Sequence, residues 1–284
     1  MLDCSINDRL DYFRKDSWIP YSAANDVLKK LEDLVRYPKC ERMPNLAISA
    51  RTNNGKTRLI NYFASLHPAS DNPSGNAIVA PVLSLQCPGV PDESRLYDVI
   101  LGKLCKRFRP SATPREKLPI VIDVLREIDL RVLIIDEVNY SESGSLDRQK
   151  IFLNALRYLG GELQVSIVTA GTEEMMRVIR TVPTVENRFI PAFLPMWPMD
   201  MEFRQLAASF EALIPLPEPS DLSRKALATL LHSKSGATIG ELKLLLMLAS
   251  EYAMRNGLPK IDDEVIAKCG YMSPSERKRL NVPI

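Results

Sequence analysis

The chain is poor in the residues that build metal sites and disulfide frameworks. It has only two histidines, and its five cysteines, at positions 4, 40, 87, 105 and 269, form no Cys-x-x-Cys pair. A zinc site and a disulfide scaffold are therefore not expected. Scattered thiols are typical of a protein from a reducing cytoplasm.

Long apolar runs and an excess of charge are missing too. Nowhere are there the roughly 18 consecutive apolar residues of a membrane span. The N-terminal stretch MLDCSINDRLDYFRKD is charged rather than apolar, so no signal peptide is expected. The net charge of +2 does not by itself require a nucleic-acid partner. We expect a cytoplasmic protein without a membrane partner.

What is present is an alternation of apolar runs and helical patterns. With 284 residues and 45% hydrophobic content, the chain can bury one large or two modest cores. Strands are predicted between helices, which implies a parallel sheet with helices on both faces. The predicted strands are 45–49, 77–85, 132–135 and 165–170, and the predicted helices of this region are 56–66, 94–108, 114–128 and 146–159.

The two ends of the chain have a different pattern. Residues 1–40 are predicted to form an N-terminal helical segment, with a helix over 21–36, and residues 41–196 the α/β core. Beyond a proline-rich transition, only helical patterns remain, and they predict a helical domain over 197–272 and a basic tail over 273–284. The helices expected in that domain are 200–213, 221–233, 239–256 and 262–268.

The strongest functional signal is a phosphate-binding loop between the first strand and its helix. The loop has the pattern of a phosphate loop, with alanine in place of the usual opening glycine. Its backbone N–H groups can converge on a β-phosphate, its lysine can reach the β/γ oxygens, and its threonine hydroxyl can bind Mg²⁺. A polar turn without a ligand is the alternative. The candidate nucleotide-binding residues are Ala50, Arg51, Thr52, Asn53, Asn54, Gly55, Lys56, Thr57 and Arg58.

A second motif supports this interpretation. The apolar run VLIIDE at 132–137 predicts a buried strand that ends in two carboxylates. Asp136 is placed to bind Mg²⁺ together with Thr57, and Glu137 to polarise the attacking water. An ordinary charged strand end is the alternative. The two motifs predict ATP and Mg²⁺ as the ligands.

The order of the motifs resembles one family. The segments WIPY (18–21), RMPNL (42–46), TNNGKT, IIDE, 168–189 and 236–257 resemble the TniB/TnsC group of AAA+ ATPases, the regulators of DDE transposons, over about residues 17–268. The resemblance implies an α/β fold, namely an AAA+ P-loop αβα sandwich with a parallel sheet, followed by a small helical lid domain.

The resemblance also implies further site residues. Thr172 matches the polar sensor of the γ-phosphate, for which a helix N-cap is the alternative. Arg188 matches the arginine finger that enters the neighbouring subunit's site, with a surface ion pair as the alternative. The stretch Trp18, Ile19 and Tyr21 matches the adenine-side wall, or else packs the N-terminal helix against the core.

Two positions depart from the pattern or extend it. Where relatives have a sensing arginine early in the lid helix, this chain has Glu241, and Lys243 is one helical step away. Asn139, two residues after Glu137, is a candidate for orienting that carboxylate.

A DNA-binding surface is expected from the basic residues between 95 and 117. The resemblance implies that this region tracks the backbone of duplex DNA without reading its sequence, which gives a steep salt dependence. A solvated helix face is the alternative. The candidates are Arg95, Lys103, Lys106, Arg107 and Arg109, with Arg115 and Lys117 nearby, and a second basic cluster, 277–279, lies in the tail.

The resemblance implies a bacterial, nucleoid-associated regulator of transposition. ATP-bound subunits would form a ring or helical filament on DNA, recruit a DDE transposase and respond to a TniQ-like target selector, and hydrolysis would disassemble the assembly. The alternatives are a replication initiator or loader of the same fold, a nucleotide-gated scaffold with weak hydrolysis, and a small-molecule kinase.

Overall fold

The structure is a computed structural model that describes residues 2–15, 17–73, 75, 77–90, 92–138, 146–180 and 182–279. The chain forms two compact units. The sheet unit comprises 22–52 and 56–194, and the helical unit comprises 1–21, 53–55 and 195–284. The predicted division at residues 40, 196 and 272 stays a prediction.

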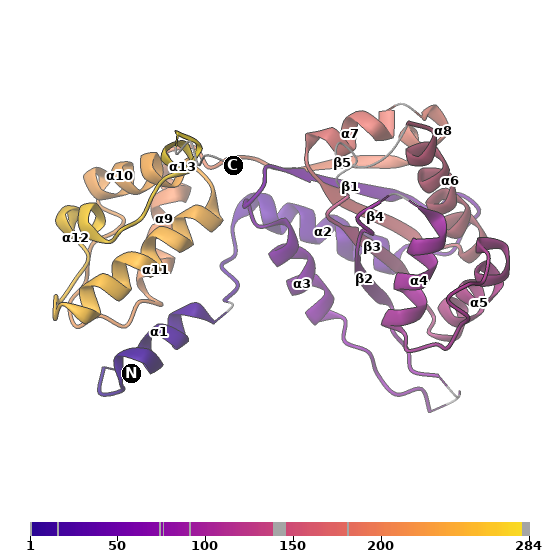
Figure 1. Ribbon diagram of the computed structural model, residues 1–284, viewed down its shortest axis with the longest axis horizontal. Coiled ribbons are helices and arrows are strands. Elements are labelled where there is room, and N and C mark those ends of the chain that lie inside the picture. The colour runs from indigo at the N-terminus through magenta and orange to yellow at the C-terminus, as the bar shows by residue number, and fades with distance from the viewer. Residues whose placement is uncertain are drawn as a thin grey trace. The chain divides into compact units, whose positions relative to one another are not determined.

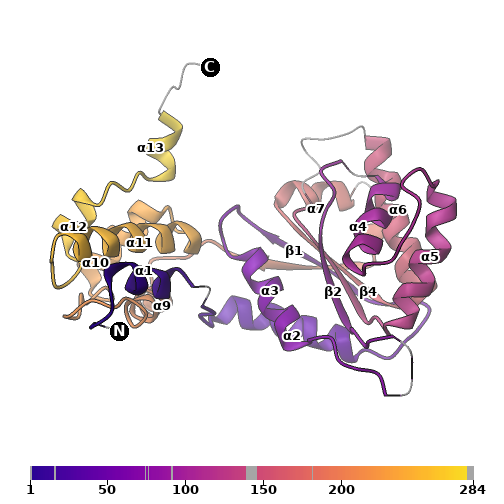
Figure 2. The same cartoon turned by 60° about the horizontal axis from the view of Figure 1, so that its bottom comes forward.

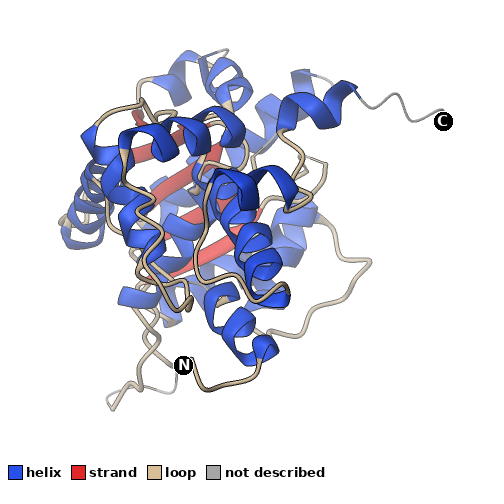
Figure 3. Cartoon of the chain, turned by 90° about the vertical axis from the view of Figure 1, so that its left-hand side faces the viewer, coloured by secondary structure: helices blue, strands red, loops and turns tan. Residues whose placement is uncertain are grey.

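The sheet unit is built on five parallel strands in the order β2-β3-β4-β1-β5. The central strands β1, β3 and β4 are buried along their whole length, which suits a sheet covered on both faces. Figure 1 shows the strands side by side, and Figure 3 shows them in red among blue helices. The strands are β1 (Asn45–Ala50), β2 (Val82–Gln86), β3 (Val132–Asp136), β4 (Ser166–Gly171) and β5 (Phe189–Leu194).

Helices cover both faces of the sheet (Figure 2). One face carries α2 and α3, which contact each other and strand β1, and the other carries α4 to α8. A capping box starts α5, because the Thr113 hydroxyl accepts from the Glu116 N–H while the Glu116 carboxylate accepts from the Thr113 N–H. The helices are α2 (Ser22–Arg36), α3 (Lys56–Leu66), α4 (Glu93–Lys103), α5 (Pro114–Glu127), α6 (Leu146–Leu163), α7 (Glu173–Arg180) and α8 (Pro183–Glu186).

Two of the predicted elements need correction, and one strand was missed. Strand β2 begins at Val82, whereas a strand was expected from residue 77; Val79 pairs only with Ser70, in an isolated antiparallel bridge. Helix α4 ends at Lys103, whereas a helix was expected to continue to residue 108. Two residues after Lys103, Cys105 takes a left-handed backbone conformation with φ of 53°. Strand β5 was not predicted. It lies at the sheet edge beside β1, where Pro191 is tolerated because a strand edge does not need its N–H.

The helical unit packs around a core of its own. Phe13 of α1 joins buried residues of the C-terminal helices such as Phe203, Leu231 and Leu245. Helix α1 contacts α11, and Arg14 forms an ion pair with Glu251 at 3.5 Å. The helices are α1 (Ile6–Arg14), α9 (Met201–Glu211), α10 (Lys225–Ser235), α11 (Ile239–Arg255), α12 (Asp263–Lys268) and α13 (Pro274–Arg279).

The parallel sheet with helices on both faces, followed by a helical portion, confirms the predicted fold class. Part of the tail that was predicted to be basic forms helix α13. Among the described residues, no helix is both long and apolar enough to pass through a membrane.

Candidate nucleotide site

The strand order brings the two sequence motifs together. Strand β4 lies between β1 and β3, and the three strands run parallel. Their carboxyl ends therefore share one edge of the sheet, where ligands bind in folds of this kind. Ala50 ends β1, Asp136 ends β3 and Gly171 ends β4, so the phosphate loop, the carboxylate pair and the stretch that begins with Thr172 start at this edge.

Lys56 opens helix α3 and turns back to the loop that precedes it. Its ammonium group donates to the carbonyl oxygens of Ala50 at 2.8 Å and Arg51 at 3.2 Å. Partial burial lowers the pKa of Lys56, opposed by the charges of Asp136 and Glu137. A cation at a helix N-terminus, among main-chain N–H groups, suits an anionic ligand.

Thr57 and Asp136 make the contact that a magnesium site would require. The Thr57 hydroxyl donates to Asp136 Oδ2 at 2.6 Å, across 79 residues of sequence. Asp136 is only 6% exposed, and its other oxygen accepts from the Glu137 N–H at 2.8 Å. A hydroxyl and a carboxylate are hard oxygen ligands of the kind that Mg²⁺ takes, so these two residues fit the metal.

Glu137 is held in an unusual conformation. Its φ is 56°, a left-handed value that is rare outside glycine and that often marks functional sites. Gln86, at the end of β2, pairs with Asp136 in the sheet register, and its side-chain amide donates to the Glu137 carboxylate. A carboxylate has two acceptor oxygens, and the Gln86 amide occupies one of them, Oε2. Asn139 lies outside the described residues.

Thr172 follows strand β4, and its hydroxyl donates to the Glu174 carboxylate. This bond is the first cause of a lowered pKa at Glu174. The Thr172 carbonyl accepts from the Met175 N–H at 3.2 Å, which fits the start of α7. The sensor role of Thr172 stays a prediction.

Arg188 lies directly before strand β5. Its backbone is fixed, because its N–H donates to Val185 and its carbonyl accepts from Asn45. The alternative of a surface ion pair finds no support in the described part of the chain, where the half-exposed guanidinium has no ion-pair or hydrogen-bond partner. Arg188 is thus available for a ligand or a neighbouring subunit.

The tip of the phosphate loop, 53–55, belongs to the helical unit. The buried Asn54 donates to the Pro195 carbonyl at 2.8 Å. Gly55 has a φ of 85°, which a residue with a side chain rarely adopts, and a Cβ there would lie 3.9 Å from the Tyr21 hydroxyl. The left-handed Asn53, with φ of 62°, is the second special position of the loop.

The predicted adenine-side residues are partly buried in the helical unit. Trp18, Ile19 and Tyr21 are each intermediate in exposure. The rings of Tyr21 and Trp197 lie 4.7 Å apart, and burial raises the pKa of Tyr21 to about 12. Packing in the core of this unit accounts for these contacts, and the role at the adenine stays a prediction.

In the remainder of the phosphate loop, Arg51 and Thr52 are exposed, and Arg58 is half-buried on α3.

The predicted DNA-binding residues all lie on the surface of the sheet unit, and Lys106 forms an ion pair with Glu127 at 3.5 Å. The exposed basic residues are Arg95, Lys103, Lys106, Arg107 and Arg109.

Lys117 was expected near the basic DNA-binding surface, but it is not part of that surface. Its side chain is buried, and the ammonium group contacts Asp98 at 2.7 Å and donates to Ser94 at 2.9 Å. It also lies 5.5 Å from the centre of the Phe108 ring. A buried ammonium needs such partners, so Lys117 joins α4 to α5 and cannot contact DNA.

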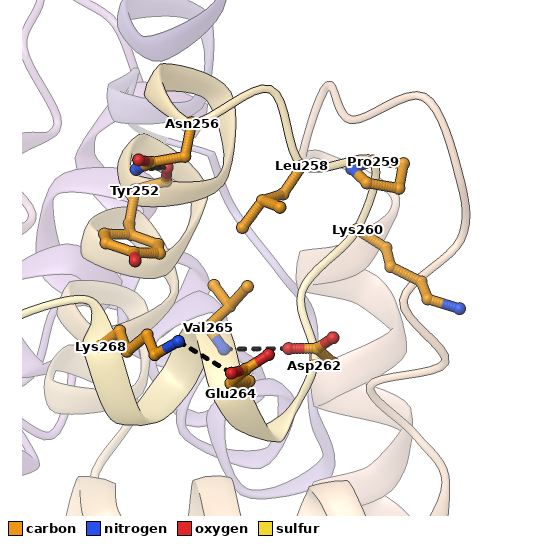
Figure 4. A pocket seen from close by; sticks show the side chains of 9 residues that line it. All are labelled: Tyr252, Asn256, Leu258, Pro259, Lys260, Asp262, Glu264, Val265 and Lys268. Carbon is orange, nitrogen blue, oxygen red and sulfur yellow. Dashed lines mark hydrogen bonds and ion pairs between the residues drawn. The ribbon is translucent and has the colours of Figure 1, made fainter.

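The helical unit has a pocket of about 300 Å³ between the end of α11, the loop that follows and α12 (Figure 4). None of the predicted site residues lines it. Lys268 pairs with Glu264 at 2.8 Å, and Lys260 points away from the other side chains in the view. The pocket is lined by apolar residues and by equal numbers of acidic and basic side chains, so its lining does not indicate a particular ligand.

Two further residues contact the candidate site, and neither contact could be predicted from the sequence. Gln86 gave no signal, because a glutamine at a strand end is common; only the sheet register brings it to Glu137. Glu241 was noted as a departure, and in the structure its carboxylate accepts from the Asn53 side chain at 2.9 Å.

Comparison with known families identifies the chain. Residues 9–199, more than half of its length, match the family described as Bacterial TniB protein. The chain belongs to the TniB family. This confirms the resemblance seen in the motifs. No curated protein is matched.

Solved structures share the fold of this TniB protein at low identity. The ORC2 protein of Aeropyrum pernix, solved with ADPNP and ADP, is 15% identical, with a TM-score of 0.62 over 91% of this chain and 70% of that one. Cdc6p of Pyrobaculum aerophilum is 16% identical, with a TM-score of 0.62 over 91% and 69%. The RuvB branch migration motor of Thermotoga maritima is 13% identical, with a TM-score of 0.55 over 91% and 72%.

These likenesses show the fold, which is that of AAA+ ATPases. Together with the family match, they identify the protein as a TniB-family AAA+ ATPase.

Proposed function

We propose that this TniB protein is an ATP-dependent regulator of DNA transposition. Its ATP-bound subunits assemble as a ring or helical filament on duplex DNA, recruit a DDE transposase and respond to a TniQ-like target selector. The observation that carries the proposal is the contact of Thr57 with Asp136 at 2.6 Å, beside Lys56, in a chain of the TniB family.

ATP binding rests on the phosphate loop. Lys56 would exchange its contacts with the Ala50 and Arg51 carbonyls for the β- and γ-phosphates. Thr57 and Asp136 would hold Mg²⁺, which when bound neutralises charge on the phosphates. Thr172, past the end of β4, would contact the γ-phosphate.

Hydrolysis requires a base that orients water. Glu137 is the carboxylate next to the proposed magnesium ligands, and its left-handed backbone fixes its direction. The hydrogen bond from Gln86 holds Oε2 of this carboxylate, and turning the side chain toward the attacking water would require that bond to be given up. We therefore infer that the isolated subunit hydrolyses ATP slowly.

Assembly would complete the site. Arg188 has a fixed backbone and a guanidinium without a partner in the described part of the chain. Donated to the neighbouring subunit, it would stabilise the charge of the transferring phosphoryl group. A head-to-tail contact of this kind gives a ring or an open filament, and hydrolysis at the contacts would disassemble it.

DNA binding would use the exposed basic residues that follow β2, such as Arg107 and Arg109. Contacts with phosphates position a protein without reading sequence, so the target would be chosen by the selector protein. Among the structural neighbours, the Aeropyrum pernix ORC1 protein was solved in complex with DNA. A DNA-bound assembly would place the protein at the nucleoid, within the cytoplasm.

A nucleotide-gated scaffold is the second candidate function. The bond from Gln86 to Glu137 favours it, because a carboxylate held by this bond is less free to orient the attacking water, and hydrolysis would then be slow. In that case the protein would bind ATP and join proteins on DNA, and ATP hydrolysis would not limit the lifetime of the assembly.

DNA binding by anisotropy of a fluorescent duplex tests the proposal. We expect tight binding with ATP, weak binding without nucleotide, and little dependence on the duplex sequence. Lys56→Ala is the matched control, and it should bind weakly under both conditions. Equal binding with and without ATP would contradict the proposal.

A further inference from the structure

Glu241 is a buried acid in the first turn of helix α11. It is 6% exposed, and both of its carboxylate oxygens are occupied. Oε1 accepts from Asn53 of the phosphate loop at 2.9 Å, while Oε2 accepts from the Tyr271 hydroxyl at 2.8 Å and from the Arg277 guanidinium of α13. The four residues belong to the same compact unit.

The phosphate loop is fitted closely against this turn of α11. The Gly240 N–H donates to the Asn53 carbonyl at 3.0 Å. A Cβ at Gly240 would lie 2.0 Å from Asn53 Oδ1, so only glycine allows the approach. The conformation of Asn53, which is left-handed, is thus fixed both through its backbone and through its side chain.

The charge of Glu241 is a problem for a loop that binds a triphosphate. A carboxylate in contact with the loop repels the phosphates, and a buried one is costly unless it is paired. Arg277 supplies the opposite charge, with its side chain 42% exposed against 8% for Glu241. Burial, and next the bond to Glu241, raise the pKa of Tyr271, so the phenol stays a neutral donor.

We propose that Arg277, in the C-terminal helix α13, is a positioning residue of the nucleotide site. It neutralises Glu241 and thereby lets the carboxylate hold Asn53 without opposing ATP. The inference rests on the proposed binding of ATP at the phosphate loop. It gives the end of the chain a role in nucleotide affinity, which the sequence gives no reason to expect.

The test compares ATP affinity in matched variants, with a fluorescent ATP analogue as the probe. Arg277→Ala should raise Kd on the order of tenfold, because one charge next to the loop is left uncompensated. Lys278→Ala removes the same charge from the same helix at an exposed position and should leave Kd unchanged. In steady-state hydrolysis, Arg277→Ala should raise KM and leave kcat near the wild-type value.

The double variant separates charge from structure. Glu241→Gln keeps an oxygen for Asn53 but removes the repulsion, so Arg277→Ala with Glu241→Gln should return Kd to within about threefold of wild type. Arg277→Lys should stay close to wild type. Thermal unfolding of each variant reports folding separately from binding.

Three results would overturn the inference. An Arg277→Ala protein that binds the analogue as tightly as wild type would remove the role of Arg277. A double variant no better than Arg277→Ala would mean that the residue acts through structure alone. Failure of the wild-type protein to bind the analogue would overturn the proposed function as well.

Discussion

The hydroxyl of Thr57 and the carboxylate of Asp136 are 2.6 Å apart, although 79 residues separate them in the sequence. The neighbouring strands β1, β4 and β3 bring them together. Without this contact, the loop and the strand end would be two separate motifs. With it, they form one candidate site.

Replacing Thr57 with valine keeps the shape of the side chain and removes the hydroxyl. We expect Mg²⁺-dependent ATP hydrolysis to fall at least about tenfold, because one proposed ligand is lost. Binding of ADP in the presence of EDTA should stay close to wild type. The substitution also removes a donor from the buried Asp136 carboxylate, so the free energy of unfolding should fall by about 1–3 kcal/mol, and thermal unfolding shows that the variant is folded. Unchanged hydrolysis would remove Thr57 from the site.

Gln86→Ala should raise the basal hydrolysis rate several-fold, in the absence of DNA. The substitution removes the amide that holds Glu137 Oε2 and so frees the side chain to turn toward the attacking water. Phosphate release measures the rate. In a Glu137→Gln background, where hydrolysis should already be about 10²-fold lower, the effect of Gln86→Ala should disappear. A lower rate in Gln86→Ala would show that Gln86 assists the reaction instead.

Arg188 can be tested by mixing two inactive proteins. Lys56→Ala lacks the phosphate contact but keeps Arg188, and Arg188→Ala lacks the guanidinium but keeps its own phosphate loop. If Arg188 acts in the neighbouring subunit, a mixture on duplex DNA should hydrolyse ATP faster than either protein alone. A mixture no faster than the sum of its components would place Arg188 elsewhere.

Lys117 and the exposed basic residues should behave in opposite ways. Lys117→Ala should lower the free energy of unfolding by about 1–3 kcal/mol, because it breaks a buried contact whose partner Asp98 is partly exposed. Chemical denaturation measures this. Arg107→Ala with Arg109→Ala should leave stability unchanged and reduce the salt dependence of DNA binding. A double variant with wild-type salt dependence would exclude this surface from the DNA contact.

The central strands of the sheet could be predicted from the sequence, but the edge strand β5 could not. The buried strands β1, β3 and β4 are near-continuous apolar runs, so their positions could be predicted. Strand β5 could not, because Pro191 interrupts a run with exposed residues, and such a pattern is tolerated only at a sheet edge.

In the candidate site, too, some residues could be predicted from the sequence and others could not. Lys56, Thr57 and Asp136 belong to local motifs with fixed spacing, and these motifs can be found in one sequence. The contacts of Gln86 and Arg277 could not be found in this way, because only the fold brings these residues to Glu137 and Glu241. The burial of Lys117 likewise depends on contacts with α4 that composition does not reveal.

Nucleotide-dependent assembly on DNA is the central feature of the proposed function. We would image the purified protein with duplex DNA by negative-stain electron microscopy, with a slowly hydrolysed ATP analogue and without nucleotide, and with Arg188→Ala alongside. The account predicts rings or filaments on DNA that require the analogue and are lost in Arg188→Ala. Monomers under every condition would contradict it, and so would assemblies that form without nucleotide.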